Sequence, residues 1–124
     1  MADKVVDASA LAAILFEEPE GNAVAIELGG HRLIAPALLP FEVGNVCVKK
    51  MRAHPTERDA ILARFSKYID FPIALFPIDA SAMAETAALL GLSAYDASYL
   101  LLAKQRRAEL ITLDAKLEKA AAKI

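Results

Sequence analysis

The chain has few of the features that would place it outside a reducing compartment. It holds one cysteine, Cys47, which excludes an internal disulfide and a zinc site built from cysteines. Cys47 lies in an apolar helical pattern, so we expect a buried small side chain rather than a catalytic thiol. No apolar run approaches the roughly 20 residues needed to cross a bilayer. Asp3 and Lys4 interrupt the N-terminal stretch, which argues against a signal peptide. We therefore expect a cytoplasmic protein with no membrane segment.

Positive charge is also in short supply. Lysine and arginine number 14 against 16 aspartates and glutamates, for a formal net charge of −2, so the chain has no overall basic surface for nucleic acid. The basic residues do cluster, and a local patch can still bind a polyanion. Solvated helix faces are the ordinary explanation of such clusters. The candidates for contacts with RNA phosphates are Lys49, Lys50, Lys104, Arg106 and Arg107.

Apolar residues, in contrast, are abundant. At 124 residues and 56% hydrophobic content, the chain has the length of one domain, which we expect to span residues 1–124, and more than enough apolar area for its core. The excess leaves apolar surface for a partner. There is no low-complexity segment and no linker.

Short apolar strands alternate with helical patterns along the chain. We expect strands at residues 4–6, 32–35, 73–76 and 110–113. We expect helices at residues 9–17, 20–28, 38–52, 56–68, 79–90, 95–107 and 115–122, with Thr56 capping the fourth. Strands separated by helices indicate βα crossovers and a parallel sheet, and strands this apolar are typical of sheets covered on both faces.

Four carboxylates occupy informative places in this pattern. Asp7 and Asp114 end the first and last predicted strands, and Glu42 and Asp96 lie in the first turns of predicted helices. In an open parallel sheet, residues just past the carboxyl ends of the strands line the ligand crevice. Acidic groups gathered there repel one another unless a cation lies between them, and oxygen ligands suit a hard divalent ion. The pattern predicts metal-dependent phosphate chemistry.

Each carboxylate also has a simpler structural explanation. Asp directly before a helix is often an N-cap, worth about 1 kcal/mol, which applies to Asp7, Asp79 and Asp114. Ser93 and Asp96 have the spacing of a capping box. Glu42 fits this explanation poorly, because it lies beside an apolar helix face where an unpaired carboxylate is costly.

Several neighbouring polar residues have two open interpretations. Asn45 and Lys49 share one side of the helix with Glu42. Ser9 either caps the first helix or touches a metal-bound water, and Thr112 either packs on a strand face or supports the site. Tyr95 and Tyr99 are expected to pack in the core, with base stacking as the less favoured alternative.

The segments Val-Val-Asp7-Ala-Ser9, Pro40-Phe-Glu42-Val-Gly-Asn45, Tyr95-Asp96-Ala and Leu-Ile-Thr112-Leu-Asp114 resemble those of the PIN-domain ribonucleases, and among them the VapC-type toxins. The resemblance covers nearly the whole chain. It implies a three-layer α/β/α sandwich with a central, mostly parallel sheet. It also implies that Asp7, Glu42, Asp96 and Asp114 bind Mg²⁺ or Mn²⁺, with Ser9 and Thr112 at polar positions that line the site. Asn45, on the same side of its helix as Glu42, is a further candidate beside the metal.

The resemblance further implies function. A VapC-type toxin is an endoribonuclease that hydrolyses RNA phosphodiester bonds, forms a homodimer and is blocked by a VapB-like antitoxin. The number of metal ions, the carboxylates that ligate them directly and the target RNA stay open.

Two other acidic α/β folds fit poorly. A response-regulator receiver has an acidic pair after the first strand and an aspartate after the third. This chain has Phe76-Pro77 after its third predicted strand. A haloacid-dehalogenase-type phosphatase wants Asp-x-Asp after the first strand, but residue 9 is serine. The stronger alternative is a non-catalytic α/β protein-interaction module whose acids are only caps.

Overall fold

A four-stranded parallel sheet forms the centre of the molecule. The structure is a computed structural model that describes residues 2–123. The strands are β1 (Asp3–Val6), β2 (Arg32–Pro36), β3 (Ile73–Phe76) and β4 (Glu109–Ile111). They pair in the order β3-β2-β1-β4, and every pairing is parallel. The predicted α/β fold with a parallel sheet is confirmed.

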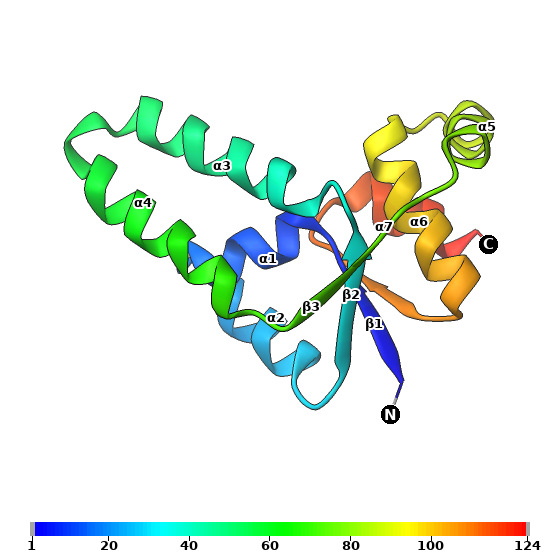
Figure 1. The fold of residues 1–124 in the computed structure, drawn as a ribbon, viewed down its shortest axis with the longest axis horizontal. Helices are drawn as coiled ribbons and strands as arrows, with labels where there is room; N and C mark the ends of the chain where they lie inside the picture. The colour runs from blue at the N-terminus through cyan, green and yellow to red at the C-terminus, as the bar shows by residue number, and fades with distance from the viewer. Residues whose placement is uncertain (1, 124) are drawn as a thin grey trace.

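Helices connect the strands and cover both faces of the sheet. They are α1 (Ala8–Leu15), α2 (Gly21–Leu28), α3 (Leu39–Ala53), α4 (Arg58–Ser66), α5 (Ala80–Leu90), α6 (Ala94–Arg106) and α7 (Ala115–Ala122). The connections from β1 to β2 and from β2 to β3 step one way across the sheet, and the connection from β3 to β4 steps back. Because such crossovers are right-handed, α1–α4 and α5–α6 lie on opposite faces, as Figure 1 shows.

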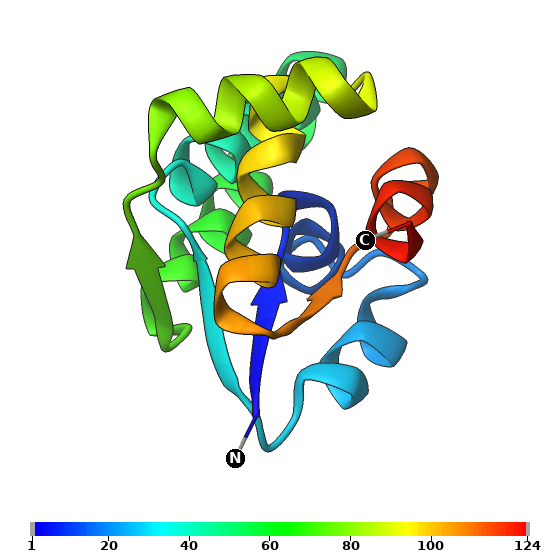
Figure 2. The ribbon, with the colours of Figure 1, turned by 90° about the vertical axis from the view of Figure 1, so that its right-hand side faces the viewer.

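The core lies between the sheet and its helices. α6 packs against β1 and β2, and Figure 2 shows it in front of these strands with α5 crossing its upper end. Val5, Val6 and Ile34 are fully buried, as expected for strands covered on both faces. Cys47 is buried as predicted, and burial raises the pKa of its thiol.

No single helix in the described range is long and apolar enough to cross a membrane. α5 and α6 meet that test only as a pair, across a bend of 107°.

The segment predicted as one helix at residues 56–68 is divided in three. A 3₁₀ turn at Pro55–Glu57 precedes α4, and a second at Lys67–Asp70 follows it. The prediction that Thr56 caps this helix is wrong. Thr56 lies inside the first turn, which the Glu57 N–H closes onto the His54 carbonyl at 3.0 Å.

The last strand is shorter than predicted. β4 ends at Ile111 rather than at residue 113, and Thr112 turns its hydroxyl toward Asp7 instead of extending the strand. The other predicted elements agree with the structure to within two residues. Gly29 and Gly91 end α2 and α5, and Gly91 has the left-handed φ of 66° that favours glycine there.

Candidate metal centre

Asp7 is the most deeply buried charged group of the site. It follows β1 and is the N-cap of α1, where its Oδ1 accepts hydrogen bonds from the Ala10 N–H at 2.9 Å and the Ser9 hydroxyl at 2.7 Å. Its Oδ2 accepts a hydrogen bond from the Thr112 hydroxyl. With 5% of its surface exposed, Asp7 is held in one orientation by three donors. The predicted cap is confirmed.

Burial raises the pKa of the Asp7 carboxyl above its ordinary value. The hydrogen bonds from Thr112, Ala10 and Ser9 lower this pKa in part, while the charge of Asp114 raises it further. The net direction is upward, so the ionised form of Asp7 lacks full compensation in the protein alone.

Ser9 and Thr112 join the ends of β1 and β4. The Ser9 hydroxyl accepts a hydrogen bond from the Leu113 N–H at 2.9 Å, and Thr112 accepts one from the Asp114 N–H at 3.0 Å. Asp114 caps α7 by accepting from the Leu117 N–H at 3.0 Å. Neither hydroxyl takes the simpler role expected of it, as a helix cap or a packed strand residue. Both orient Asp7.

Glu42 and Asp96 reach the site from the first turns of α3 and α6. Ser93 caps α6 by accepting from the Asp96 N–H at 3.0 Å. Within residues 2–123 the reciprocal bond of the predicted capping box, from the Ser93 N–H to the Asp96 carboxylate, is absent. In the same range, the carboxylates of Glu42 and Asp96 form no side-chain hydrogen bond and no ion pair, so both are available to a ligand.

The charges of the four carboxylates act on one another. After burial, the largest influences that raise the pKa of Asp96 are Asp114 and Asp7. Burial raises the pKa of Glu42, the Tyr99 hydroxyl lowers it, and Asp96 and Asp7 raise it again. Groups distant in the sequence therefore converge at the carboxyl-terminal end of the sheet. We call Asp7, Glu42, Asp96 and Asp114 the acidic cluster.

Four helices begin at this cluster. Asp7 and Asp114 cap α1 and α7, and Glu42 and Asp96 lie in the first turns of α3 and α6. Helix N-termini carry partial positive charge and free N–H groups. They offset part of the acidic charge and favour an anionic ligand such as a phosphate.

The chemistry of the cluster suits a hard divalent cation. All four donors are carboxylates. Burial above all, and then the charges of neighbouring carboxylates, raise the pKa of Asp7, Glu42 and Asp96, and a cation would offset that negative charge. Among residues 2–123, no three acidic, histidine or cysteine side chains lie close enough to enclose an ion as they stand. Mg²⁺ keeps several of its waters and needs only one or two carboxylates directly, so the residues present fit it.

Among residues 2–123, the other predicted site residues form no hydrogen bond or ion pair with the acidic cluster. Asn45 and Lys49 are exposed on α3. Lys50 pairs with Glu18 at 3.9 Å and lies over the Phe16 ring.

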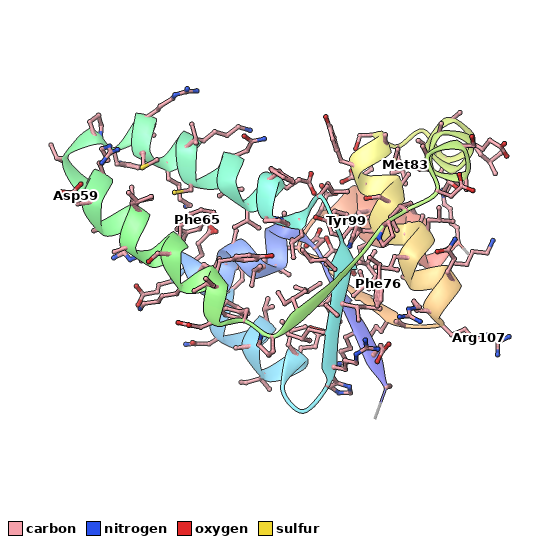
Figure 3. The ribbon with its side chains drawn as sticks, in the orientation of Figure 1. Asp59, Phe65, Phe76, Met83, Tyr99 and Arg107 are labelled. Atoms are coloured by element: carbon pink, nitrogen blue, oxygen red, sulfur yellow. The ribbon has the colours of Figure 1, made fainter. Side chains whose placement is uncertain are left out.

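The remaining basic residues, Lys104, Arg106 and Arg107, are at the far end of α6. At 1.5 Å per residue, Lys104 lies about 12 Å along α6 from Asp96. Arg106 stacks on the Phe76 ring at 4.1 Å, and Figure 3 shows Arg107 pointing away from the body of the molecule. The structure does not bring this group to the acidic cluster.

Two residues near the acidic cluster were not predicted to belong to the site. Lys116 lies close enough to lower the pKa of Asp96, and its position two residues after Asp114 is the signal that could have identified it. Tyr99 is 1% exposed, in the core as predicted, but its hydroxyl has no hydrogen-bond partner in the described part of the chain. Nothing in the sequence indicates that.

Comparison with known proteins identifies the class. Residues 4–123 match the PIN domain, and the chain belongs to this family. Its structure is similar to that of PAE2754 from Pyrobaculum aerophilum, with a TM-score of 0.77 and 28% identity over 96% of this chain and 84% of that one.

A second similar structure is more distant in sequence. VapC20 of Mycobacterium tuberculosis, a toxin that cleaves the sarcin–ricin loop, has a TM-score of 0.68 and 12% identity over 94% of both chains. At that identity the likeness concerns the fold alone. No curated protein matches the sequence significantly. The predicted PIN-domain resemblance is confirmed.

Proposed function

We propose that this protein is a Mg²⁺- or Mn²⁺-dependent endoribonuclease that hydrolyses RNA phosphodiester bonds in the cytoplasm. The observation that carries the proposal is the acidic cluster: four carboxylates from separate segments gathered at four helix N-termini, three of them with raised pKa values. Repulsion among these groups needs a cation to balance it, and a cation there would attract a phosphate. A bound divalent ion would neutralise the phosphate and activate water at neutral pH.

The chain's own residues have distinct parts in this proposal. Asp7, fixed by Ser9 and Thr112, is the most rigid candidate ligand. Glu42, Asp96 and Asp114 supply the remaining oxygens for one or two ions. The helix N-termini orient the phosphate, since their N–H groups donate to its oxygens.

Basic residues near the site are candidates for phosphates beyond the scissile bond. Lys116 is the best placed, because its charge already acts on Asp96. Lys49 and Lys50 would contact the phosphates of an RNA strand that crosses α3. Lys104, Arg106 and Arg107 would contact RNA several nucleotides away, since they lie at the other end of α6.

We further propose that the protein is the toxin of a toxin–antitoxin pair, with a VapB-like antitoxin and a homodimeric assembly. Large apolar side chains are exposed, including Ile26 at 82%, Ile69 at 84% and Leu89 at 83%. A protein interface on this chain would cover such side chains. The toxin VapC20, which has the same fold, makes this family role the natural one.

RNA cleavage tests the proposed activity. We expect wild-type protein to cleave RNA with Mg²⁺, to stop in EDTA, and to lose at least about 100-fold of its rate in Asp7→Asn. Asp79→Asn is the matched control, because Asp79 caps α5 at a similar strand-to-helix junction but lies outside the acidic cluster. It should cleave at the wild-type rate.

Undiminished cleavage in EDTA or by Asp7→Asn would contradict the metal mechanism. Sequencing the 5′ ends of the products would identify the target RNA.

A further inference from the structure

The Tyr99 side chain presents an anomaly that the proposed function leaves unused. It lies in the second turn of α6, one helical turn after Asp96, and is 1% exposed. Its hydroxyl is the one buried side-chain polar atom within residues 2–123 that has no hydrogen-bond partner. Buried polar groups without partners are rare in folded proteins because their desolvation is uncompensated. Such a group indicates that a partner is missing or not yet engaged.

The surroundings of the hydroxyl identify that partner. Figure 3 places Tyr99 in the interior, near the ends of β1 and β2. The Glu42 carboxylate is close enough for the hydroxyl to lower its pKa, although the pair does not meet hydrogen-bond geometry in the structure. A phenol is protonated at neutral pH, and an ionised carboxylate can only accept hydrogen bonds. The Tyr99 hydroxyl can therefore act only as a donor toward the carboxylates of the acidic cluster.

Glu42 and Asp96 are the two members of the cluster that lack such a donor among the described residues, and of the two only Glu42 has its pKa lowered by the Tyr99 hydroxyl. Asp7 is oriented by three donors and Asp114 by the Leu117 N–H. Glu42 has no side-chain hydrogen bond among the described residues, so no donor there fixes the direction of its oxygens. One hydrogen bond from a rigid, buried phenol would fix one oxygen and leave the other facing the cluster.

We propose that Tyr99 is a positioning residue that donates a hydrogen bond to the Glu42 carboxylate and orients its free oxygen toward a divalent cation. Tyr99 then does for Glu42 what Ser9 and Thr112 do for Asp7. The inference rests on the proposed metal-binding function, since without a cation Glu42 has no ligand to face. Groups of this kind, which orient a ligand without touching the metal, change metal affinity when removed.

Tyr99→Phe removes the hydroxyl and keeps the ring. Calorimetric titration should show that the variant binds Mn²⁺ with a dissociation constant about tenfold higher than that of wild type. The metal-free variant, heated in EDTA, should unfold at the same temperature as wild type or a higher one, because it no longer buries an unpartnered hydroxyl. A purely structural role for the hydroxyl would instead lower the unfolding temperature and leave Mn²⁺ affinity unchanged.

Two further variants locate the effect. Tyr95→Phe makes the same chemical change on the same helix, beside Asp96, at a side chain that is 63% exposed; it should bind Mn²⁺ like wild type. In a Glu42→Gln background, Tyr99→Phe should weaken Mn²⁺ binding by much less than tenfold, since the two residues act as a pair.

The outcomes separate this inference from the function on which it rests. If Asp7→Asn abolishes Mn²⁺ binding but Tyr99→Phe binds normally, the proposed site stands and the role of Tyr99 is wrong. A full tenfold effect of Tyr99→Phe in the Glu42→Gln background would also contradict it. If wild type and Asp7→Asn fail equally to bind Mn²⁺, the metal site and this inference are both overturned.

Discussion

At the scale of single residues, the acidic cluster combines structural and functional roles in the same side chains. Asp7 and Asp114 each cap a helix and also belong to the acidic cluster. A cap and a ligand use different lone pairs of one carboxylate, since each ionised group can accept several bonds. The simple explanation of these residues as caps is therefore correct without excluding metal binding. Among residues 2–123 the carboxylates of Glu42 and Asp96 accept no capping hydrogen bond, so the explanation as caps does not extend to them, and the proposed metal site gives them a role.

The raised pKa of Glu42 makes stability depend on pH. In the folded, metal-free protein, burial above all lifts this pKa above its ordinary value of 4.5. The folded state then holds the proton more tightly than the unfolded chain. Ionisation of Glu42 therefore lowers the free energy of unfolding as pH rises from the unfolded pKa through the folded one.

Glu42→Gln removes this effect. In EDTA, the variant and wild type should have similar free energies of unfolding at about pH 4. The variant should become the more stable of the two as the pH rises toward neutrality. Urea unfolding across this range measures the difference. Glu85→Gln, at an exposed position on α5, is the control and should differ little at any pH. A constant difference, or a larger one in acid, would show that Glu42 is not destabilised as a free carboxylate.

At the scale of elements, most boundaries could be predicted because their signals are local. Asp7, Asp79, Ser93 and Asp114 cap the helices that follow them, and glycines end α2 and α5. The end of β4 could not be predicted in this way. Thr112 has the propensity of a strand residue, but a hydrogen bond to Asp7, 105 residues away, turns it out of the ladder.

Two helical glycines offer a test of how closely the elements pack. A Cβ on Gly21, the first residue of α2, would lie 2.4 Å from the Ala13 carbonyl oxygen of α1. A Cβ on Gly44 within α3 would meet only the tip of the Phe65 ring, at 3.8 Å.

We expect opposite signs from the same substitution at these positions. Gly44→Ala should raise the free energy of unfolding by about 0.5–1 kcal/mol through helix propensity. Gly21→Ala should lower it by about 1–3 kcal/mol, because the α1 backbone must move. Denaturant unfolding of the two variants measures both. A Gly21→Ala protein as stable as wild type would mean that α1 and α2 do not pack this closely.

At the scale of the whole molecule, the sheet brings together residues that are scattered through the sequence. The order β3-β2-β1-β4 puts β1 and β4 side by side, so Asp7 and Asp114 become neighbours although 107 positions separate them. This convergence could be predicted from the rule that parallel strands end at one edge. The neighbours of each carboxylate could not be, because they depend on side-chain packing. Tyr99 beside Glu42 and Lys116 beside Asp96 are the examples.

Charge is distributed unevenly over the same fold. The acidic cluster occupies one end of α6, and Lys104, Arg106 and Arg107 occupy the other. A chain with a net charge of −2 can therefore still present a local basic surface to a polyanion, and the proposed cation at the acidic cluster would add a second attraction.

The central claim is that the four carboxylates form one site for a divalent cation. A crystal structure with Mn²⁺, using its anomalous scattering, tests this most directly. The account predicts an anomalous peak inside the acidic cluster, within about 2.0–2.3 Å of at least one carboxylate oxygen, and no peak there in Asp7→Asn crystals. Crystals grown with saturating Mn²⁺ that show no peak in the cluster, or peaks only elsewhere on the surface, would contradict it.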